Sequence, residues 1–248
     1  MAGQIHVGIG GWDYDPWRGT FYPPGLPKAK QLHHAARRLT AIEINATYYK
    51  LQKPELYERW AAEVPDGFLF ALKGSRFCTN RKLLGEAGEA VERFCGQGIS
   101  RLGPKLGPIL WQLAETKRFD ADEIAAFLAL LPREQDGVPL RHVLEARHES
   151  FRDDRFMAIV RDAGAAVCTV DQGDGAAPAE PEGPFVYVRL KGAREEEPAG
   201  YPPAELDVWA RRAARWSADG RDVFLFVING AKARAPAAAE ALIARIES

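Results

Sequence analysis

The sequence predicts an α/β protein whose eight parallel strands close into a (β/α)8 barrel of the TIM type. Strand-like and helix-like segments alternate along the whole chain, which is the pattern of a parallel sheet. Eight strands also fit the chain length of 248 residues, which is typical of one such barrel. We therefore expect residues 1–248 to form a single domain, and an open doubly wound sheet is the alternative fold.

The predicted strands are short apolar runs, several with a period of two, that end near glycine, proline or charged residues. In chain order they cover residues 7–11, 41–45, 68–73, 109–113, 141–148, 166–171, 185–191 and 222–229. The connection at residues 172–184 is rich in Gly, Ala and Pro and has no helical period. One helix of the barrel is therefore expected to be missing between the sixth and seventh strands.

The other connections carry helical signals. Pro54 is well placed in the first turn of one helix, and acidic residues occupy the first turn of the helix after residue 121. Four glycines weaken the prediction for the segment that follows the third strand. The predicted helices cover residues 28–39, 54–64, 85–101, 122–131, 153–163, 203–217 and 236–247.

Composition excludes some classes of function. The formal net charge is -1, so wholesale wrapping by nucleic acid is not expected, although a local basic patch stays open. No apolar run reaches the length of a membrane span, and residues 1–6 lack the features of a signal peptide. The three cysteines Cys78, Cys95 and Cys168 form no CxxC pair. We read them as reduced thiols of a cytoplasmic protein without membrane partners.

The second strand carries the clearest polar signal. Ile42 and Ile44 alternate with Glu43 and Asn45, so the two polar side chains share one face. Such a pair is suited to holding a polar ligand. The alternative is a buried Glu43 that is satisfied within a structural hydrogen-bond network, and this segment alone does not decide between the two.

Polar residues gather at the ends of most predicted strands. Parallel strands of a barrel bring their C-terminal ends to one mouth, where barrel enzymes place their sites. Alternation places these side chains opposite the main apolar residues of each strand. The candidate site residues are Trp12, Glu43, Asn45, Tyr48, Lys73, Gln112, Glu145, Arg147, His148, Asp171, Arg189, Lys191 and Asn229.

Three acids and three cations of this set are expected to line one pocket: Glu43, Lys73, Glu145, Arg147, Asp171 and Arg189. The three acids are the candidate catalytic residues, with Glu43 or Glu145 as a general acid or base whose pKa burial raises. The cations, together with Lys191, would hold an anion. The rings of Trp12 and Tyr48 would stack on the ligand, and Asn45, Gln112, His148 and Asn229 complete the binding set.

Structural alternatives remain open for several of these residues. Glu145 with Arg147 can equally form an ion pair that closes the barrel. Arg189 and Lys191 can be solvated at a strand end. His148 differs from Glu145 in parity and can lie in the following loop.

No metal site or cofactor is predicted. The chain has no HxH, HExxH or Cys/His pattern typical of zinc, no GxGxxG after a strand and no P-loop. Four cations at the predicted mouth, Lys73, Arg147, Arg189 and Lys191, instead favour a phosphate or carboxylate ligand.

Four motifs occur together in this chain: Gly10-Gly11-Trp12, the run from Glu43 to Tyr49, Leu102-Gly103-Pro104 and Glu145-Ala146-Arg147-His148. In these motifs the chain resembles the YecE-like proteins, the family of domain of unknown function 72. The resemblance implies a TIM-type barrel and names no reaction. Relatives usually have histidines where this chain has Asn80, Lys191 and Gly230, which weakens any mechanism based on imidazole.

Three functions follow as hypotheses. The first is a hydrolase-type enzyme, a hydrolase or lyase acting on a small phosphorylated or sugar-like substrate at the barrel mouth. The alternative is a nucleic-acid or nucleotide-binding protein, or a metal-assisted phosphodiesterase, whose aromatic loop at Trp12, Trp17 and Tyr22 stacks bases. The third is a catalytically silent metabolite-binding protein. Substrate identity and oligomeric state are not predicted.

Overall fold

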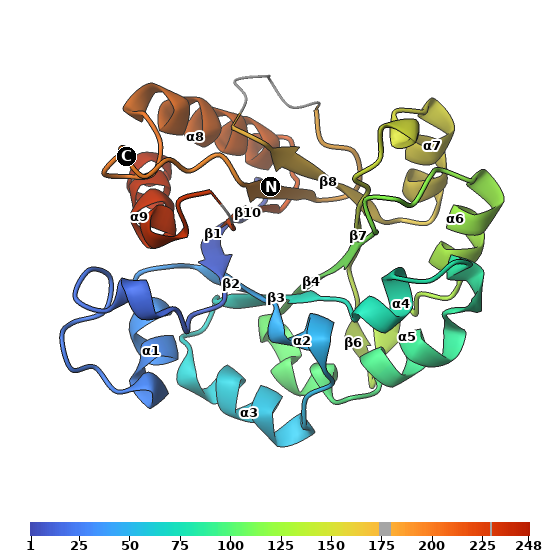
Figure 1. The fold of residues 1–248 in the computed structure, drawn as a ribbon, viewed down its shortest axis with the longest axis horizontal. Coiled ribbons are helices and arrows are strands. Elements are labelled where there is room, and N and C mark those ends of the chain that lie inside the picture. Colours follow the sequence, from blue (N-terminus) through green and yellow to red (C-terminus); the bar gives the residue numbers. More distant parts are fainter. Residues whose placement is uncertain (174–179, 229) are drawn as a thin grey trace.

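Eight parallel strands form a closed barrel in a computed structural model that describes residues 1–173, 180–228 and 230–248. Their order around the barrel is β1-β10-β9-β8-β7-β4-β3-β2 (Figure 1). β1 pairs with β2 on one side and with β10 on the other, which closes the sheet. The predicted TIM-type barrel is confirmed, and the open sheet is excluded.

The strands lie close to their predicted positions. The predicted fifth strand is too long, because the strand ends at Glu145 and residues 146–148 lie in the following loop. The strand bounds are β1 Ile5–Gly10, β2 Ala41–Ile44, β3 Leu69–Lys73, β4 Leu106–Gln112, β7 His142–Glu145, β8 Ala166–Asp171, β9 Val186–Leu190 and β10 Val223–Val227.

Helices surround the barrel (Figure 1). The longer ones are α1 Lys28–Ala35, α3 Pro54–Glu63, α5 Gly88–Cys95, α6 Ala121–Ala129, α7 Asp154–Asp162, α8 Pro203–Ala218 and α9 Ala235–Ile246. Two single-turn helices, α2 Ala46–Tyr49 and α4 Arg76–Thr79, follow β2 and β3. Between β8 and β9 the described residues contain no helix, and residues 174–179 lie outside the described part of the chain.

Two predictions for the connections are corrected. The segment predicted as one helix at residues 85–101 is α5 flanked by two 3-10 helices, and Gly98 adopts a φ of 102° between α5 and the second of them. A two-stranded hairpin, β5 Glu134–Gln135 with β6 Val138–Pro139, was not predicted. Its turn residues Asp136 and Gly137 both have positive φ, as a tight hairpin turn requires.

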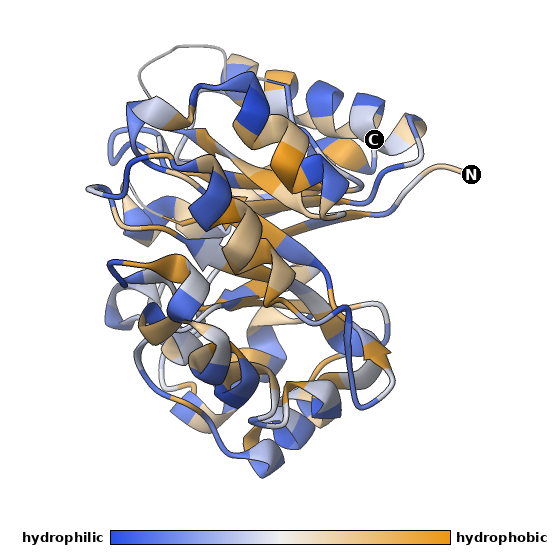
Figure 2. Cartoon of the chain, turned by 90° about the vertical axis from the view of Figure 1, so that its right-hand side faces the viewer, coloured by the Kyte–Doolittle hydropathy of each residue, from blue (hydrophilic) through white to orange (hydrophobic). Residues whose placement is uncertain are grey.

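The core has two parts, separated by the sheet. The larger part lies between the strands and the helices, and hydrophobic residues are concentrated along the strands and inner helix faces (Figure 2). The smaller part fills the barrel interior. It includes the small side chains of Ala41 and Ala71, from β2 and β3, and the larger rings of Tyr187 and Phe226, from β9 and β10.

Among the residues that the structure describes, no helix is both long and apolar enough to cross a membrane.

Candidate functional site

Four charged side chains meet at the C-terminal end of the barrel interior. Glu43 is the next-to-last residue of β2, and Glu145 is the last residue of β7. Arg189 is the next-to-last residue of β9, and Lys191 directly follows this strand. Alternation along each strand directs them inward, because Ala41, Val143 and Tyr187, two residues earlier, belong to the interior core. We call Glu43, Glu145, Arg189 and Lys191 the charged floor.

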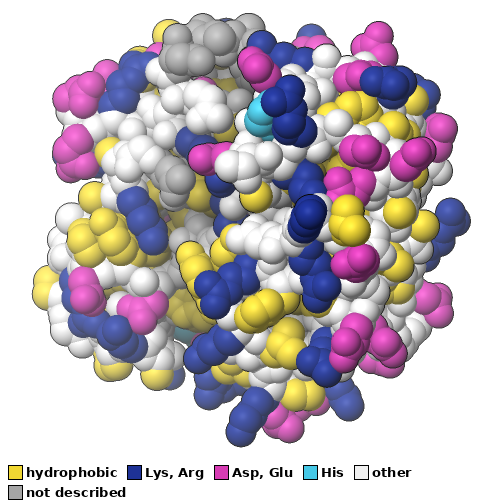
Figure 3. Space-filling view, turned by 45° about the vertical axis from the view of Figure 1, so that its right-hand side comes forward, with side chains coloured by type: hydrophobic (Ala, Val, Ile, Leu, Met, Phe, Trp, Pro, Cys, Tyr) yellow, Lys and Arg dark blue, Asp and Glu magenta, His cyan; other side chains and the backbone are white. Residues whose placement is uncertain are grey.

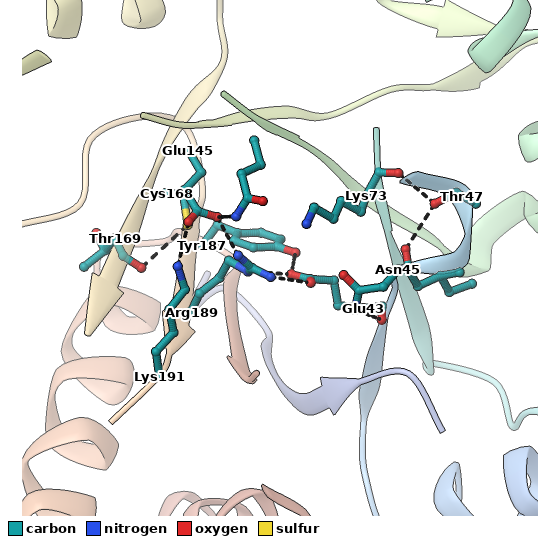
Figure 4. Close-up of polar contacts among 12 residues, drawn as sticks. Glu43, Asn45, Thr47, Lys73, Glu145, Cys168, Thr169, Tyr187, Arg189 and Lys191 are labelled. Carbon is teal, nitrogen blue, oxygen red and sulfur yellow. Dashed lines mark hydrogen bonds and ion pairs between the residues drawn. The ribbon is translucent and has the colours of Figure 1, made fainter. Parts of the chain in front are cut away.

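Arg189 joins the two carboxylates of the charged floor. Its guanidinium donates two hydrogen bonds to Glu43, at 3.1 and 3.0 Å, and a third to Glu145 Oε2 at 2.6 Å. Figure 4 shows the guanidinium lying between the two acids. Both glutamate side chains are 0% exposed and that of Arg189 is 3% exposed. The network is therefore sealed from bulk solvent.

Neutral groups and a lysine complete the floor. The Tyr187 hydroxyl donates to Glu43 Oε2 at 2.8 Å, and the Gln112 amide donates to Glu145 Oε2 at 2.9 Å. Lys191 Nζ donates to Glu145 Oε1 at 2.8 Å. Two acids thus face two cations, with every carboxylate oxygen accepting at least one hydrogen bond. Buried charge is tolerated under such conditions.

The floor carboxylate Glu145 is held ionised. Burial alone would raise its pKa, but the charges of Arg189 and Lys191 outweigh burial and lower the pKa to about 2. The pKa of Arg189 is raised, because Glu43 and Glu145 outweigh the opposing effect of burial. The expectation of a raised pKa is therefore wrong for Glu145.

A cavity of about 580 Å³ lies above the charged floor at the barrel mouth. Figure 3 shows a face of the molecule that is hollowed near its centre, with Lys and Arg side chains beside the hollow. The cavity is lined by Gly10, Gly11, Trp12, Asp13, Ile44, Asn45, Ala46, Tyr49, Trp60, Lys73, Gln112, Arg147, Arg189, Lys191, Ile228 and Lys232. We call it the mouth cavity.

Two lysines of the mouth cavity have no carboxylate partner among the described residues. The amine of Lys73 lies 4.2 Å from the centre of the Tyr48 ring, and that of Lys232 lies 4.5 Å from the centre of the Tyr14 ring. Burial is the main cause that lowers both pKa values. For Lys73, burial and the nearby Arg189 charge outweigh Glu43 and Glu145, and the pKa falls to about 8.

The comparisons with known proteins identify the family. The family model described as "Protein of unknown function DUF72" matches residues 6–248, almost the whole chain. The chain belongs to the DUF72 family. It is 31% identical over 143 residues to the UPF0759 protein YecE of Escherichia coli K12, an alignment that covers 56% of this chain and 49% of that relative. The chain thus matches about half the length of this curated DUF72 relative.

Solved structures of DUF72 proteins have the same fold. A DUF72 protein from Thermotoga maritima superposes with a TM-score of 0.74 at 20% identity and covers 97% of both chains. A second one, from Enterococcus faecalis V583, superposes with a TM-score of 0.72 at 16% identity and covers 98% of this chain and 94% of that one. These similarities establish the barrel fold of this DUF72 chain.

Most predicted site residues of this DUF72 chain are brought together. Glu43 and Glu145 lie in the charged floor, fully buried, and do not line the mouth cavity as predicted. Tyr48 does not line the cavity either but lies against Lys73, which does. Asn229 lies outside the described residues. The predicted residues that line the mouth cavity are Trp12, Asn45, Lys73, Gln112, Arg147, Arg189 and Lys191. Their roles in binding or catalysis stay predictions.

Asp171 does not join the mouth cavity, so that part of the predicted pocket is wrong. Its Oδ2 accepts a hydrogen bond from the Tyr201 hydroxyl at 2.9 Å, and its Oδ1 accepts one from the Gly173 N–H. The interior positions of β8 are instead Cys168 and Val170, which pack in the inner core. Asp171 therefore faces the outer side of the sheet.

His148 and Arg147 also differ from their predicted surroundings. His148 Nδ1 accepts the Ser150 N–H at 3.1 Å and caps a 3-10 helix, and the residue lines a different cavity. Arg147 does line the mouth cavity, but its ion pair at 2.5 Å is with the exposed Glu115 and not with Glu145. The open alternative of a Glu145–Arg147 pair is thus excluded.

Several cavity residues of this DUF72 chain were not predicted as site residues. Asp13, Tyr49, Trp60 and Lys232 all line the mouth cavity. Lys232 lies in a 3-10 helix that follows β10, beyond the strand-end positions to which side-chain alternation applies. Trp60 lies on α3, away from any strand end, so the strand-end rule did not select it.

Among the described residues, no group of three or more His, Cys, Asp and Glu side chains is arranged to hold a metal ion.

Replacing Lys73 by methionine is expected to raise the free energy of unfolding near neutral pH by about 1–2 kcal/mol, after a discount for its partial exposure. The reason is that the pKa is about 8 in the folded protein and 10.5 in the ordinary lysine, so protonation favours the unfolded chain. Wild-type stability therefore rises with pH between these two values. Urea unfolding across this range should show the difference between the proteins closing as Lys73 loses its charge.

Lys191→Met is the matched control for this effect. Lys191 lines the same cavity but is paired with the buried Glu145. Its removal is expected to destabilise the protein near neutral pH. If Lys73→Met destabilises to the same extent, the Lys73 ammonium does not have the lowered pKa given above.

Proposed function

We propose that this DUF72 protein is an enzyme, a hydrolase or lyase, that acts on a small phosphorylated or sugar-like metabolite held in the mouth cavity. One observation carries the proposal, the surplus of positive charge above the charged floor. In the floor, Glu43 and Glu145 balance Arg189 and Lys191. Lys73 and Lys232 then remain as cations with no carboxylate partner among the described residues.

The acid that lines the mouth cavity does not cancel this surplus. Asp13 is paired with Lys28 at 3.1 Å on the exposed rim. Arg147 adds a further cation whose partner, Glu115, is 75% exposed and thus screened by solvent. An anion entering the cavity would meet several cations from separate segments, an arrangement that suits a phosphate or carboxylate.

Aromatic walls support a ligand with a ring. The rings of Trp12 and Trp60 contact each other edge to face with their centres 5.4 Å apart, and both side chains line the mouth cavity together with Tyr49. Apolar aromatic walls with a few charged groups are typical of small-molecule sites. The Asn45 and Gln112 amides, which also line the cavity, offer hydrogen bonds to hydroxyl groups of the ligand.

Lys73 is the best candidate for proton transfer in this proposal. Efficient acid–base catalysis needs a group whose pKa lies near the working pH. The pKa of Lys73 is about 8, whereas Glu145 is held ionised with a pKa of about 2. The carboxylates of the charged floor then serve to position Arg189 and Lys191, and Lys73 donates or accepts the proton at the substrate.

Binding of inorganic phosphate and of a phosphorylated sugar, measured by calorimetry, tests the proposal. We expect both to bind in the mouth cavity, and Lys232→Met to weaken binding by about tenfold, the loss of about 1.4 kcal/mol. The matched control is Lys30→Met, which removes an exposed lysine on α1. It should leave the affinity unchanged apart from a small effect that vanishes with added salt.

The enzymatic part is tested by a screen of phosphatase, phosphodiesterase and glycosidase substrates. We expect turnover of at least one small phosphorylated or glycosidic substrate, and loss of that turnover in Lys73→Met. The proposal is abandoned if neither anion binds at low salt, or if Lys232→Met and Lys30→Met bind the phosphorylated sugar equally well.

A further inference from the structure

Lys73 combines features that favour a nucleophilic amine. It is the last residue of β3, and its carbonyl accepts a hydrogen bond from the Thr47 hydroxyl at 2.7 Å, which fixes the base of the side chain. Its amine lies over the Tyr48 ring and has no hydrogen bond or ion pair among the described residues. Figure 4 shows the side chain pointing toward the charged floor.

The groups around the amine keep part of it neutral. Arg189 and Arg147 disfavour its positive charge, and Glu43 and Glu145 favour it but are already engaged by other donors. At a pKa of about 8, about one-tenth of the amine is neutral at pH 7, against less than about one part in a thousand for an ordinary lysine. A desolvated lysine beside another cation is a known way to activate this nucleophile.

We propose that Lys73 forms an imine with the carbonyl carbon of a small substrate that also carries a carboxylate or phosphate group. This inference rests on the proposed function, because the same mouth cavity holds the anionic group. Arg147, Lys191 and Lys232 line that cavity and would bind the anion. The substrate class is thereby narrowed to oxo acids and phosphorylated aldehydes or ketones.

The chemistry balances without an oxidant or reductant. The lone pair of neutral Nζ forms a bond to the carbonyl carbon while the carbonyl π bond breaks, and a proton passes from nitrogen to oxygen to give a carbinolamine. A second proton, from water, then protonates the hydroxyl group. The C–O bond breaks, water leaves, and a protonated imine remains.

The other lysines of the cavity are less suited to this step. Lys191 donates to Glu145 at 2.8 Å, so its amine is already engaged by a carboxylate. Lys232 stands over the Tyr14 ring, in a 3-10 helix after β10, and burial is the cause that lowers its pKa. Lys73 is the one for which arginine charges add to burial. The three residues therefore provide a matched set for comparison.

Reductive trapping tests the inference. The full-length protein is incubated with glyoxylate and borohydride near neutral pH, and the modified peptides are identified by mass spectrometry. We expect Lys73 to be labelled at least about tenfold faster than Lys191, whose amine donates to Glu145, and faster than Lys232, because about one-tenth of the Lys73 amine is neutral at pH 7 with a pKa of about 8. Inorganic phosphate should slow the labelling. With neutral acetaldehyde, the labelling rate should rise with a midpoint near pH 8, as the pKa of Lys73 predicts.

Lys73→Arg separates this inference from the proposed function. Arginine keeps the positive charge but forms no imine under these conditions, so labelling at this position should vanish while phosphate binding stays within about threefold. Phosphate binding without preferential labelling of Lys73 would overturn the imine and leave the proposed function standing. Labelling of Lys73 by acetaldehyde in a protein that binds no anion would overturn the anionic substrate class in both proposals. Lys191→Arg and Lys232→Arg should still be labelled at Lys73.

Discussion

Replacing Arg189 by methionine is expected to lower the free energy of unfolding by about 3–5 kcal/mol, the largest effect of any single substitution in the site. The guanidinium is the partner of two carboxylates, Glu43 and Glu145, that are both fully buried. Removing it leaves Glu43 with the Tyr187 hydroxyl and leaves Glu145 with Lys191 and Gln112. A buried charge without its counter-charge is among the most costly features in a folded protein.

Urea unfolding monitored by circular dichroism measures this loss. Arg147→Met is the matched control, because Arg147 lines the same mouth cavity but its ion pair with Glu115 is largely exposed. Exposed pairs contribute about 0–1 kcal/mol. Equal destabilisation by the two substitutions would contradict the sealed network described above.

Lowering the pH should remove about 3 kcal/mol that ionised Glu145 contributes to the free energy of unfolding. The pKa of this group is about 2 in the folded protein and 4.5 in the ordinary glutamate, and one pH unit is worth about 1.4 kcal/mol. Because the folded value is the lower one, the contribution is fully present above 4.5 and is lost as the pH falls toward about 2. Wild-type stability should therefore decline steeply in this window.

The contribution of Glu145 is isolated by comparison with Glu145→Gln. The variant lacks the carboxylate and should be less stable near neutral pH, but the gap to the wild type should shrink as the pH falls below 4.5. Other acids titrate in both proteins and cancel in the difference. Glu115→Gln, at an exposed position, should show a gap that is small at every pH. A constant gap for Glu145→Gln would show that Glu145 is not held ionised.

The alternation of strand-like and helix-like segments along the chain predicted the fold. The alternation of side chains within each strand predicted which strand-end residues face the barrel interior, where this alternation was unambiguous. In β2 the residues Ile42 and Ile44 are both apolar and Glu43 lies between them, so the inward face follows directly. In β8 residues on both faces are apolar or small, so alternation did not fix the direction of Asp171. The prediction that His148 lines the mouth cavity was wrong for another reason. The strand ends at Glu145, and side-chain alternation does not apply in the loop beyond it.

Ion-pair partners could not be predicted from the sequence, because they depend on which side chains from different strands reach one another across the barrel interior. Arg189, on β9, reaches Glu43 on β2 and Glu145 on β7 across the barrel interior. The direction of the Glu145 pKa shift could not be predicted for the same reason. Burial was anticipated and would raise it, whereas the charges that lower it come from a strand late in the chain.

The charged floor also imposes an order on assembly. Arg189 lies 146 residues after Glu43 and 44 residues after Glu145, so a ribosome completes both acids well before their counter-charge. Until β9 is available, the two carboxylates need water, and a partial barrel that enclosed them would bury unpaired charge. Long-range contacts of this kind form late and slow folding. A nascent chain that ends before β9 should therefore keep both carboxylates hydrated in an open barrel. Water should leave the barrel interior only after the last quarter of the sequence has supplied Arg189.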